Sequence, residues 1–177
     1  YEKLEKITEQ KNHSVFNNLD FIQTFDRSYN EAIISKKTQT RITSRLARNI
    51  HDIYSNQQEF RFAIRKIYND KCCIAEDSID AGETINCEAA HIKPFSPGGN
   101  HAANNGLLLS RDLHWAFDKG CFTIDQSYEI KVHSKMKSSS LGKYDGKKIK
   151  LPNKDFWPSV RNITYHNQEI FLKFKEQ

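Results

Sequence analysis

The segment 88–120 constrains the fold of this chain more than any other, because it places two histidines and an asparagine at the borders of short predicted elements. His91, Asn105 and His114 follow one another at intervals of 14 and 9 residues. His91 ends an apolar run, Asn105 ends a loop, and His114 lies in an amphipathic stretch. A fold that brings these side chains together must turn the chain back on itself within this one segment.

Four short elements are predicted in and around the segment. The apolar runs from Ile85 to Ile92 and from Gly106 to Leu109 predict two strands. A loop rich in proline, glycine and asparagine separates them. Ser110 is a good N-cap, Asp112 suits a first turn and Gly120 is a stop signal, so a helix is predicted between Ser110 and Gly120. The predicted order is strand, loop, strand, helix.

Helical periodicity characterises the chain before this segment. Apolar residues recur at three- and four-residue steps within 20–33, 43–54 and 57–69, which predicts three amphipathic helices. The face of the third helix opposite its apolar stripe carries basic residues. We therefore expect a helical N-terminal segment at 1–56 and a second domain at 57–177.

The chain after the segment alternates between short strands and less regular structure. Strands are predicted at 121–125 and 128–133, followed by a polar, flexible stretch at 134–148 and an extended segment at 151–158. Pro158 opens a predicted C-terminal helix. The whole pattern predicts an α+β fold with a helical N-terminal region and a C-terminal helix.

The composition favours a soluble protein that binds a polyanion. The chain has 27 Lys+Arg against 22 Asp+Glu, a net charge of +5 and a pI near 9.0. The basic residues are clustered, which suits DNA, and a solvated basic surface is the alternative. No apolar run approaches the length of a membrane span, and the first thirty residues lack the pattern of a signal peptide. A cytoplasmic protein is expected.

The four cysteines indicate neither a disulfide framework nor a zinc ribbon. Cys72 and Cys73 are adjacent and cannot bridge comfortably, and no CxxC pair accompanies Cys87 or Cys121. The four cysteines are best explained as small apolar residues that keep free thiols in a reducing compartment. A zinc site built from three or four of these thiolates is the alternative.

The two histidines and the asparagine have the chemistry for phosphodiester hydrolysis. This reaction needs a water that loses a proton, and a neutral imidazole with a pKa near ~6.5 is the natural base at cellular pH. His91 could take that proton, and His114 could bind a cation through a ring nitrogen. The amide of Asn105 can donate and accept hydrogen bonds at once, and so can tie the loop down or orient His91. The remaining histidines, including His101 and His166, are expected to be structural.

The motifs EAAHIKP, NNGLLL and DLHWAFDKG, with FTID after them, resemble those of the HNH endonucleases. The resemblance is closest to the branch of bacterial restriction and modification-dependent endonucleases, and it covers residues 57–175. It implies a ββα-metal (His-Me finger) core at about residues 85–120 within an HNH nuclease domain at 57–177. In this core His91 matches the general base, Asn105 the loop-orienting asparagine and His114 the metal ligand.

The sequence departs from this family at Ala90. Many HNH enzymes have an aspartate immediately before the base as a second metal ligand. Glu88 is the nearest carboxylate and should share a strand face with position 90. Asp118 is the other candidate, as a ligand or as an acceptor for a histidine N–H. Glu88 is the preferred acidic partner.

The resemblance also implies partners and a cofactor. We expect cleavage of DNA with one divalent cation, Mg²⁺ first and Mn²⁺, Ni²⁺, Co²⁺ or Zn²⁺ as alternatives, by a bacterial restriction or defence nuclease. Expected phosphate contacts are Lys93, Arg61, Arg65 and Lys66. One such site cuts one strand, so double-strand cleavage requires a homodimer or two binding events. The start at Tyr1 leaves room for an upstream recognition domain.

Two further hypotheses remain open at this point. A DNA-binding module that keeps the fold and has lost turnover would explain Ala90. A zinc-stabilised protein-interaction domain would use the cysteines with histidine partners.

Overall fold

The computed structural model describes residues 57–82, 84–96 and 98–174. The helices predicted within 20–33 and 43–54 lie outside the described residues. The chain divides into two units, Tyr1–Ile53 and Tyr54–Gln177. Everything below concerns the second unit, and none of its described helices is long and apolar enough to cross a membrane.

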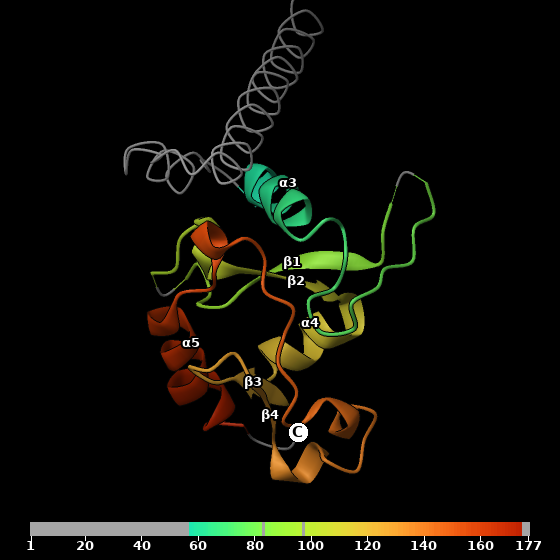
Figure 1. Cartoon of the computed structure of the whole chain (residues 1–177). Coiled ribbons are helices and arrows are strands. Elements are labelled where there is room, and N and C mark those ends of the chain that lie inside the picture. The colour runs from blue at the N-terminus through green and yellow to red at the C-terminus, as the bar shows by residue number, and fades with distance from the viewer. Residues whose placement is uncertain (1–56, 83, 97, 175–177) are drawn as a thin grey trace, which may run out of the picture. The chain divides into compact units, whose positions relative to one another are not determined.

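A two-stranded hairpin between two helices forms the centre of this unit (Figure 1). Strand β1 (Cys87–His91) pairs antiparallel with β2 (Gly106–Ser110), and helix α4 (Arg111–Asp118) follows β2 directly. Helix α3 (Gln57–Ile67) precedes the hairpin in the chain. The predicted order of strand, loop, strand and helix is therefore confirmed.

The alternation of side chains along β1 decides which helix each residue meets. Glu88 reaches His114 on α4, whereas His91 stacks on Phe60 of α3. Gly106 lies opposite His91 in the register, and a Cβ there would come within 2.3 Å of Ile64 Cδ1. Glycine at this position therefore lets α3 approach the hairpin closely enough to contact the His91 ring.

The core is built from the apolar residues of both strands and both helices. Burying a large apolar side chain contributes about 1.5–3 kcal/mol, so this group dominates the stability of the unit. The largest fully buried side chains include Phe60, Phe117, Phe122, Phe156, Ile64, Leu107, Leu108 and Leu109. Ala90 is also fully buried, so the position where many HNH enzymes have an acidic ligand contributes to packing here.

A second hairpin and the C-terminal helix complete the unit. Strand β3 (Phe122–Ile124) pairs antiparallel with β4 (Ile130–Val132), and α5 (Val160–His166) continues into a π-helical turn at Asn167–Phe171. His166 docks this helix on the core. Its Nε2 donates to the carbonyl oxygen of Phe117 at 3.0 Å, and its Nδ1 lies 2.9 Å from Thr123 Oγ1. The structural role expected for His166 fits these contacts.

Two local predictions were wrong. The stretch 134–148 is not featureless, because short 3₁₀ helices form at Ser134–Met136 and Gly142–Tyr144, and a third at Lys154–Phe156 interrupts the extended segment. Asp145 helps to order the first stretch, since its Oδ1 accepts a hydrogen bond from the Val132 N–H at 2.9 Å. Trp115 is 62% exposed and does not anchor the core. This side chain leaves α4 on the solvent side.

Candidate active site

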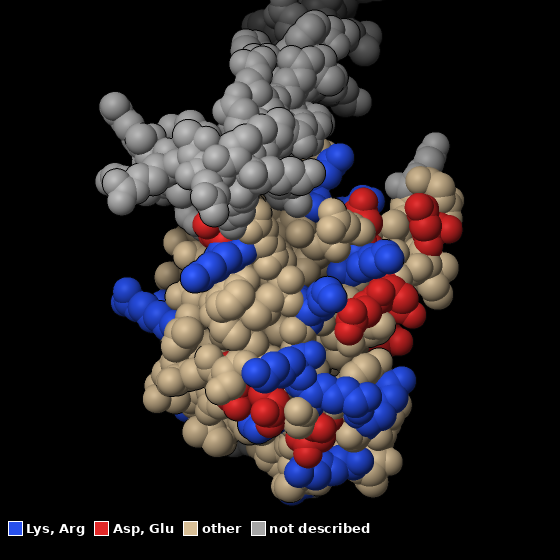
Figure 2. All heavy atoms as spheres, in the orientation of Figure 1, with Lys and Arg blue, Asp and Glu red and all other residues tan. Residues whose placement is uncertain are grey.

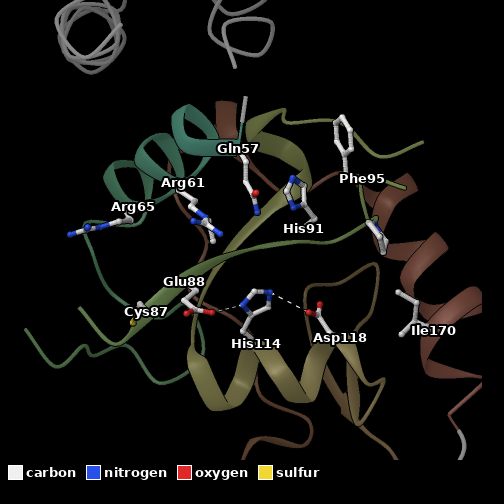
Figure 3. Close-up of a pocket in the computed structure, with 12 residues that line it drawn as sticks. Gln57, Arg61, Arg65, Cys87, Glu88, His91, Phe95, His114, Asp118 and Ile170 are labelled. Carbon is white, nitrogen blue, oxygen red and sulfur yellow. Dashed lines mark hydrogen bonds and ion pairs between the residues drawn. The ribbon is translucent and has the colours of Figure 1, made fainter. Parts of the chain in front are cut away.

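A cavity of about 590 Å³ lies along β1, between α3 and α4 (Figure 3). Gln57, Arg61 and Arg65 of α3 lie along one side of it, with Glu88 and His91 on β1 and His114 and Asp118 on α4. Four of the residues predicted for catalysis or metal binding, namely His91, His114, Glu88 and Asp118, therefore share one cavity with Arg61 and Arg65. Asn105 is not among the described residues that line it.

The ring of His91 is held from two sides at the end of β1. Phe60 stacks on its face with ring centroids 4.1 Å apart and the planes 12° from parallel. His91 Nε2 lies 3.1 Å from His101 Nδ1. Burial lowers the pKa of His91 to about 4, and electrostatic interactions with His101, His114 and Arg61 act in the same direction. The ring is therefore neutral at pH 7 and can accept a proton.

Asn105 ties together parts of the loop between β1 and β2. Its side chain is fully buried and makes three hydrogen bonds with the loop backbone. Oδ1 accepts from the Lys93 N–H at 2.9 Å, while Nδ2 donates to the carbonyl oxygens of Lys93 and Asn100, each at 2.9 Å. The backbone of Asn105 adds a bond from the Ile92 N–H to its carbonyl oxygen at 2.9 Å. These contacts match the loop-tying role that the sequence predicted.

Both carboxylates considered as metal ligands contact His114, one at each ring nitrogen. Glu88 Oε2 lies 3.0 Å from Nδ1, and Asp118 Oδ2 lies 3.4 Å from Nε2 (Figure 3). Glu88 also pairs with Arg111 through its other oxygen, at 3.2 Å. Burial raises the pKa of Asp118, against the opposing effects of His114 and Lys119. The structure thus makes both residues neighbours of His114, where the sequence had set them as alternatives.

The donor set around His114 suits a divalent cation only in part. Imidazole nitrogen and carboxylate oxygen are ligands that Mg²⁺, Mn²⁺ and Zn²⁺ accept. Within the described residues, however, no three His, Cys, Asp or Glu side chains are grouped as a metal site. Mg²⁺ commonly keeps several waters and binds through one or two carboxylates and a substrate phosphate. An ion held by His114 and one carboxylate fits that pattern.

The four basic residues expected to contact DNA divide into two pairs. Arg61 and Arg65 line the cavity, and Arg65 Nε also pairs with Asp70 Oδ1 at 2.6 Å. Lys66 and Lys93 are not among the described residues that line it. Lys66 Nζ lies over the Phe62 ring at 5.5 Å, and Lys93 Nζ over the Tyr165 ring at 4.8 Å. On the face drawn in Figure 2, lysine and arginine are interleaved with aspartate and glutamate.

The four cysteines are free thiols, and only Cys87 is among the described residues that line the cavity. Cys72, Cys73, Cys87 and Cys121 are all buried free thiols. Burial raises the pKa of Cys73, and it raises that of Cys87 to about 11. No three His, Cys, Asp or Glu side chains of the described residues are grouped as a metal site, so these residues offer no support for the zinc-stabilised alternative.

His101 is the residue of this region that the sequence did not single out. It was grouped with the structural histidines because nothing in a loop of asparagine, glycine and proline marks one histidine as special. The structure places its ring between His91 and Phe95, stacked on Phe95 with centroids 4.5 Å apart.

Comparisons with known proteins bear on the family and the fold of this chain. Residues 72–125 match the sequence model of a family described as HNH endonuclease. No curated protein sequence matches the chain. Among solved structures, the modification-dependent TagI restriction endonuclease is similar, with a TM-score of 0.55 and 17% sequence identity.

The solved structure is a longer protein than this chain. The similarity covers 73% of this chain and 44% of that protein, so the chain spans less than half of its length. At this identity the likeness shows the fold. The expected resemblance to the HNH family and the expected α+β fold with a ββα core are both confirmed.

Proposed function

Because residues 72–125 match the HNH endonuclease family model and lie within an α+β fold, we propose that this chain is a divalent-metal-dependent endonuclease that hydrolyses the phosphodiester bonds of DNA. One observation carries the proposal. A neutral, clamped His91 and a carboxylate-flanked His114 share a cavity of about 590 Å³ with two arginines.

His91 is the general base of the proposed reaction. Its ring is held by Phe60 and His101, and its lowered pKa keeps the ring neutral at pH 7, so that one ring nitrogen is unprotonated. Such a base contributes about 10²–10⁴-fold to a rate. Asn105 keeps the loop that follows His91 in place through three hydrogen bonds.

His114 and Glu88 are the proposed ligands of the cation. The two nitrogens of an imidazole ring point in diverging directions, so an ion at one nitrogen meets only one of the flanking carboxylates. Glu88 is the closer of the two, and Asp118 would then accept the N–H of the other nitrogen. When bound, a divalent cation supplies charge stabilisation at the phosphate and at the leaving oxygen.

Arg61 and Arg65 are the proposed phosphate contacts within the cavity. Guanidinium groups bind phosphate oxygens in a bidentate manner, and each contact adds counterion release to the affinity for DNA. The similar solved protein is named a modification-dependent restriction endonuclease. A restriction or defence role for this chain, with a second copy supplying the cut on the other strand, is part of the proposal.

Plasmid cleavage tests this function directly. Supercoiled DNA incubated with the chain and Mg²⁺ or Mn²⁺ should become nicked or linear, and His91→Ala should lower the rate by about 100-fold or more. A suitable control is His133→Ala, because His133 lies outside the cavity-lining residues. Undiminished cleavage by His91→Ala would refute the assignment of the base.

A DNA-binding module without turnover is the second candidate. The buried Ala90 and the incomplete set of protein ligands favour it. This candidate predicts a gel shift with DNA that is independent of divalent ions, and no strand scission with any of Mg²⁺, Mn²⁺, Ni²⁺, Co²⁺ or Zn²⁺. Scission with any of these ions would exclude it.

A further inference from the structure

A second histidine, His101, contacts the proposed base at a defined atom. His101 Nδ1 lies 3.1 Å from His91 Nε2, within hydrogen-bond distance for two ring nitrogens. One of the two must donate and the other accept. None of the hydrogen bonds among the described residues engages the other nitrogen of His91, Nδ1, which points away from His101.

The surrounding contacts hold this pair of rings in place. Phe60 stacks on His91, and Phe95 stacks on His101 with planes 15° from parallel. Asn105 binds the backbone of Lys93, two residues after His91, and of Asn100, directly before His101. One buried amide therefore connects the two backbone segments next to the histidines, which helps to fix the spacing between the two rings.

A base needs one free nitrogen, and the pairing decides which one it is. If Nε2 of His91 carries the proton and donates to His101, then Nδ1 is unprotonated and available to water. If the proton sits on Nδ1, His91 cannot act as a base toward the cavity. Orientation of a catalytic imidazole by a partner at its other nitrogen is a general device of active sites.

We propose that His101 is a positioning residue for the general base, whose Nδ1 accepts the Nε2–H of His91 and so selects the tautomer with a free Nδ1. This inference rests on the proposed function for its consequence in catalysis. His101 is not among the described residues that line the cavity, and it acts on the reaction through its contact with His91.

Two substitutions separate this role from packing. His101→Phe keeps a ring that can stack on Phe95 but has no acceptor nitrogen. His101→Asn keeps an acceptor oxygen near the position of Nδ1. We expect His101→Phe to lower kcat for plasmid cleavage by about 10- to 100-fold while KM changes little, and His101→Asn to recover part of the loss. His133→Phe controls for loss of a histidine elsewhere.

A second readout does not depend on cleavage. Nitrogen NMR of the histidine rings should show His91 with a protonated Nε2 in the wild-type chain and a mixture of tautomers in His101→Phe. A wild-type kcat and an unchanged His91 tautomer in His101→Phe would overturn the inference. If the wild-type chain cuts no DNA with any divalent ion, the proposed function fails, and the tautomer measurement still decides the role of His101.

Discussion

Replacing Asn105 should destabilise the domain by removing three buried hydrogen bonds from the loop between β1 and β2. The side chain is fully buried, and its amide makes three hydrogen bonds, two to Lys93 and one to Asn100. Asn105→Ala leaves one N–H and two carbonyl groups of the backbone without their partner. Each such loss costs about 1 kcal/mol or somewhat more, so the free energy of unfolding should fall by about 3 kcal/mol.

Asn105→Asp offers a sharper comparison because its shape is nearly the same. The aspartate keeps the bond from the Lys93 N–H, but a carboxylate would face two carbonyl oxygens that now accept from the amide. At pH 7 this variant should be at least as unstable as Asn105→Ala. The deficit should shrink at lower pH, since a protonated carboxyl can donate one bond.

Urea unfolding followed by tryptophan fluorescence reports these differences for the structural unit that contains Asn105. Both tryptophans of the chain, Trp115 and Trp157, lie in Tyr54–Gln177. With a urea dependence of about 1–3 kcal/mol per M, a loss of about 3 kcal/mol should lower the midpoint by roughly 1–3 M. Asn104→Ala is the matched control, because its side chain makes none of the hydrogen bonds recorded among the described residues. The reasoning fails if Asn105→Asp is as stable as the wild-type chain at pH 7.

Three further predictions concern the ion, the base and the dependence on pH. His114→Ala should weaken Mn²⁺ binding measured by calorimetry. Glu88→Gln should weaken this binding more than Asp118→Asn does, and the reverse order would make Asp118 the ligand. His91→Ala should leave Mn²⁺ affinity nearly unchanged while cleavage is lost, and a large loss of affinity would place His91 among the ligands. Burial lowers the pKa of His166 from 6.5 to about 4, so the unfolded chain binds this proton first as pH falls. Stability should therefore decline by about 3 kcal/mol between pH 6.5 and 4, and a flat unfolding profile over that window would contradict the burial of a neutral His166.

The hairpin and its helix were predictable because their signals are local. Periodic apolar residues, a proline- and glycine-rich loop and the Ser110 and Gly120 borders act over a few residues each. The same short-range logic placed His91 at a strand end and His114 in a helix. The order of the stretch 134–148 could not be predicted in this way, because it depends on a hydrogen bond from the Val132 N–H, in a different element, to the Asp145 side chain.

What the sequence by itself determined is the set of chemical groups and the order of the elements that carry them. Only the tertiary structure decided that Glu88 and Asp118 lie at opposite nitrogens of His114, and that His101 backs His91. These contacts depend on strand register and on the rotation of α4 about its axis. Both are fixed by packing between residues far apart in the chain, such as the close approach of α3 at Gly106. Local sequence patterns carry no record of that packing, and so the site's residues could be named before its geometry was known.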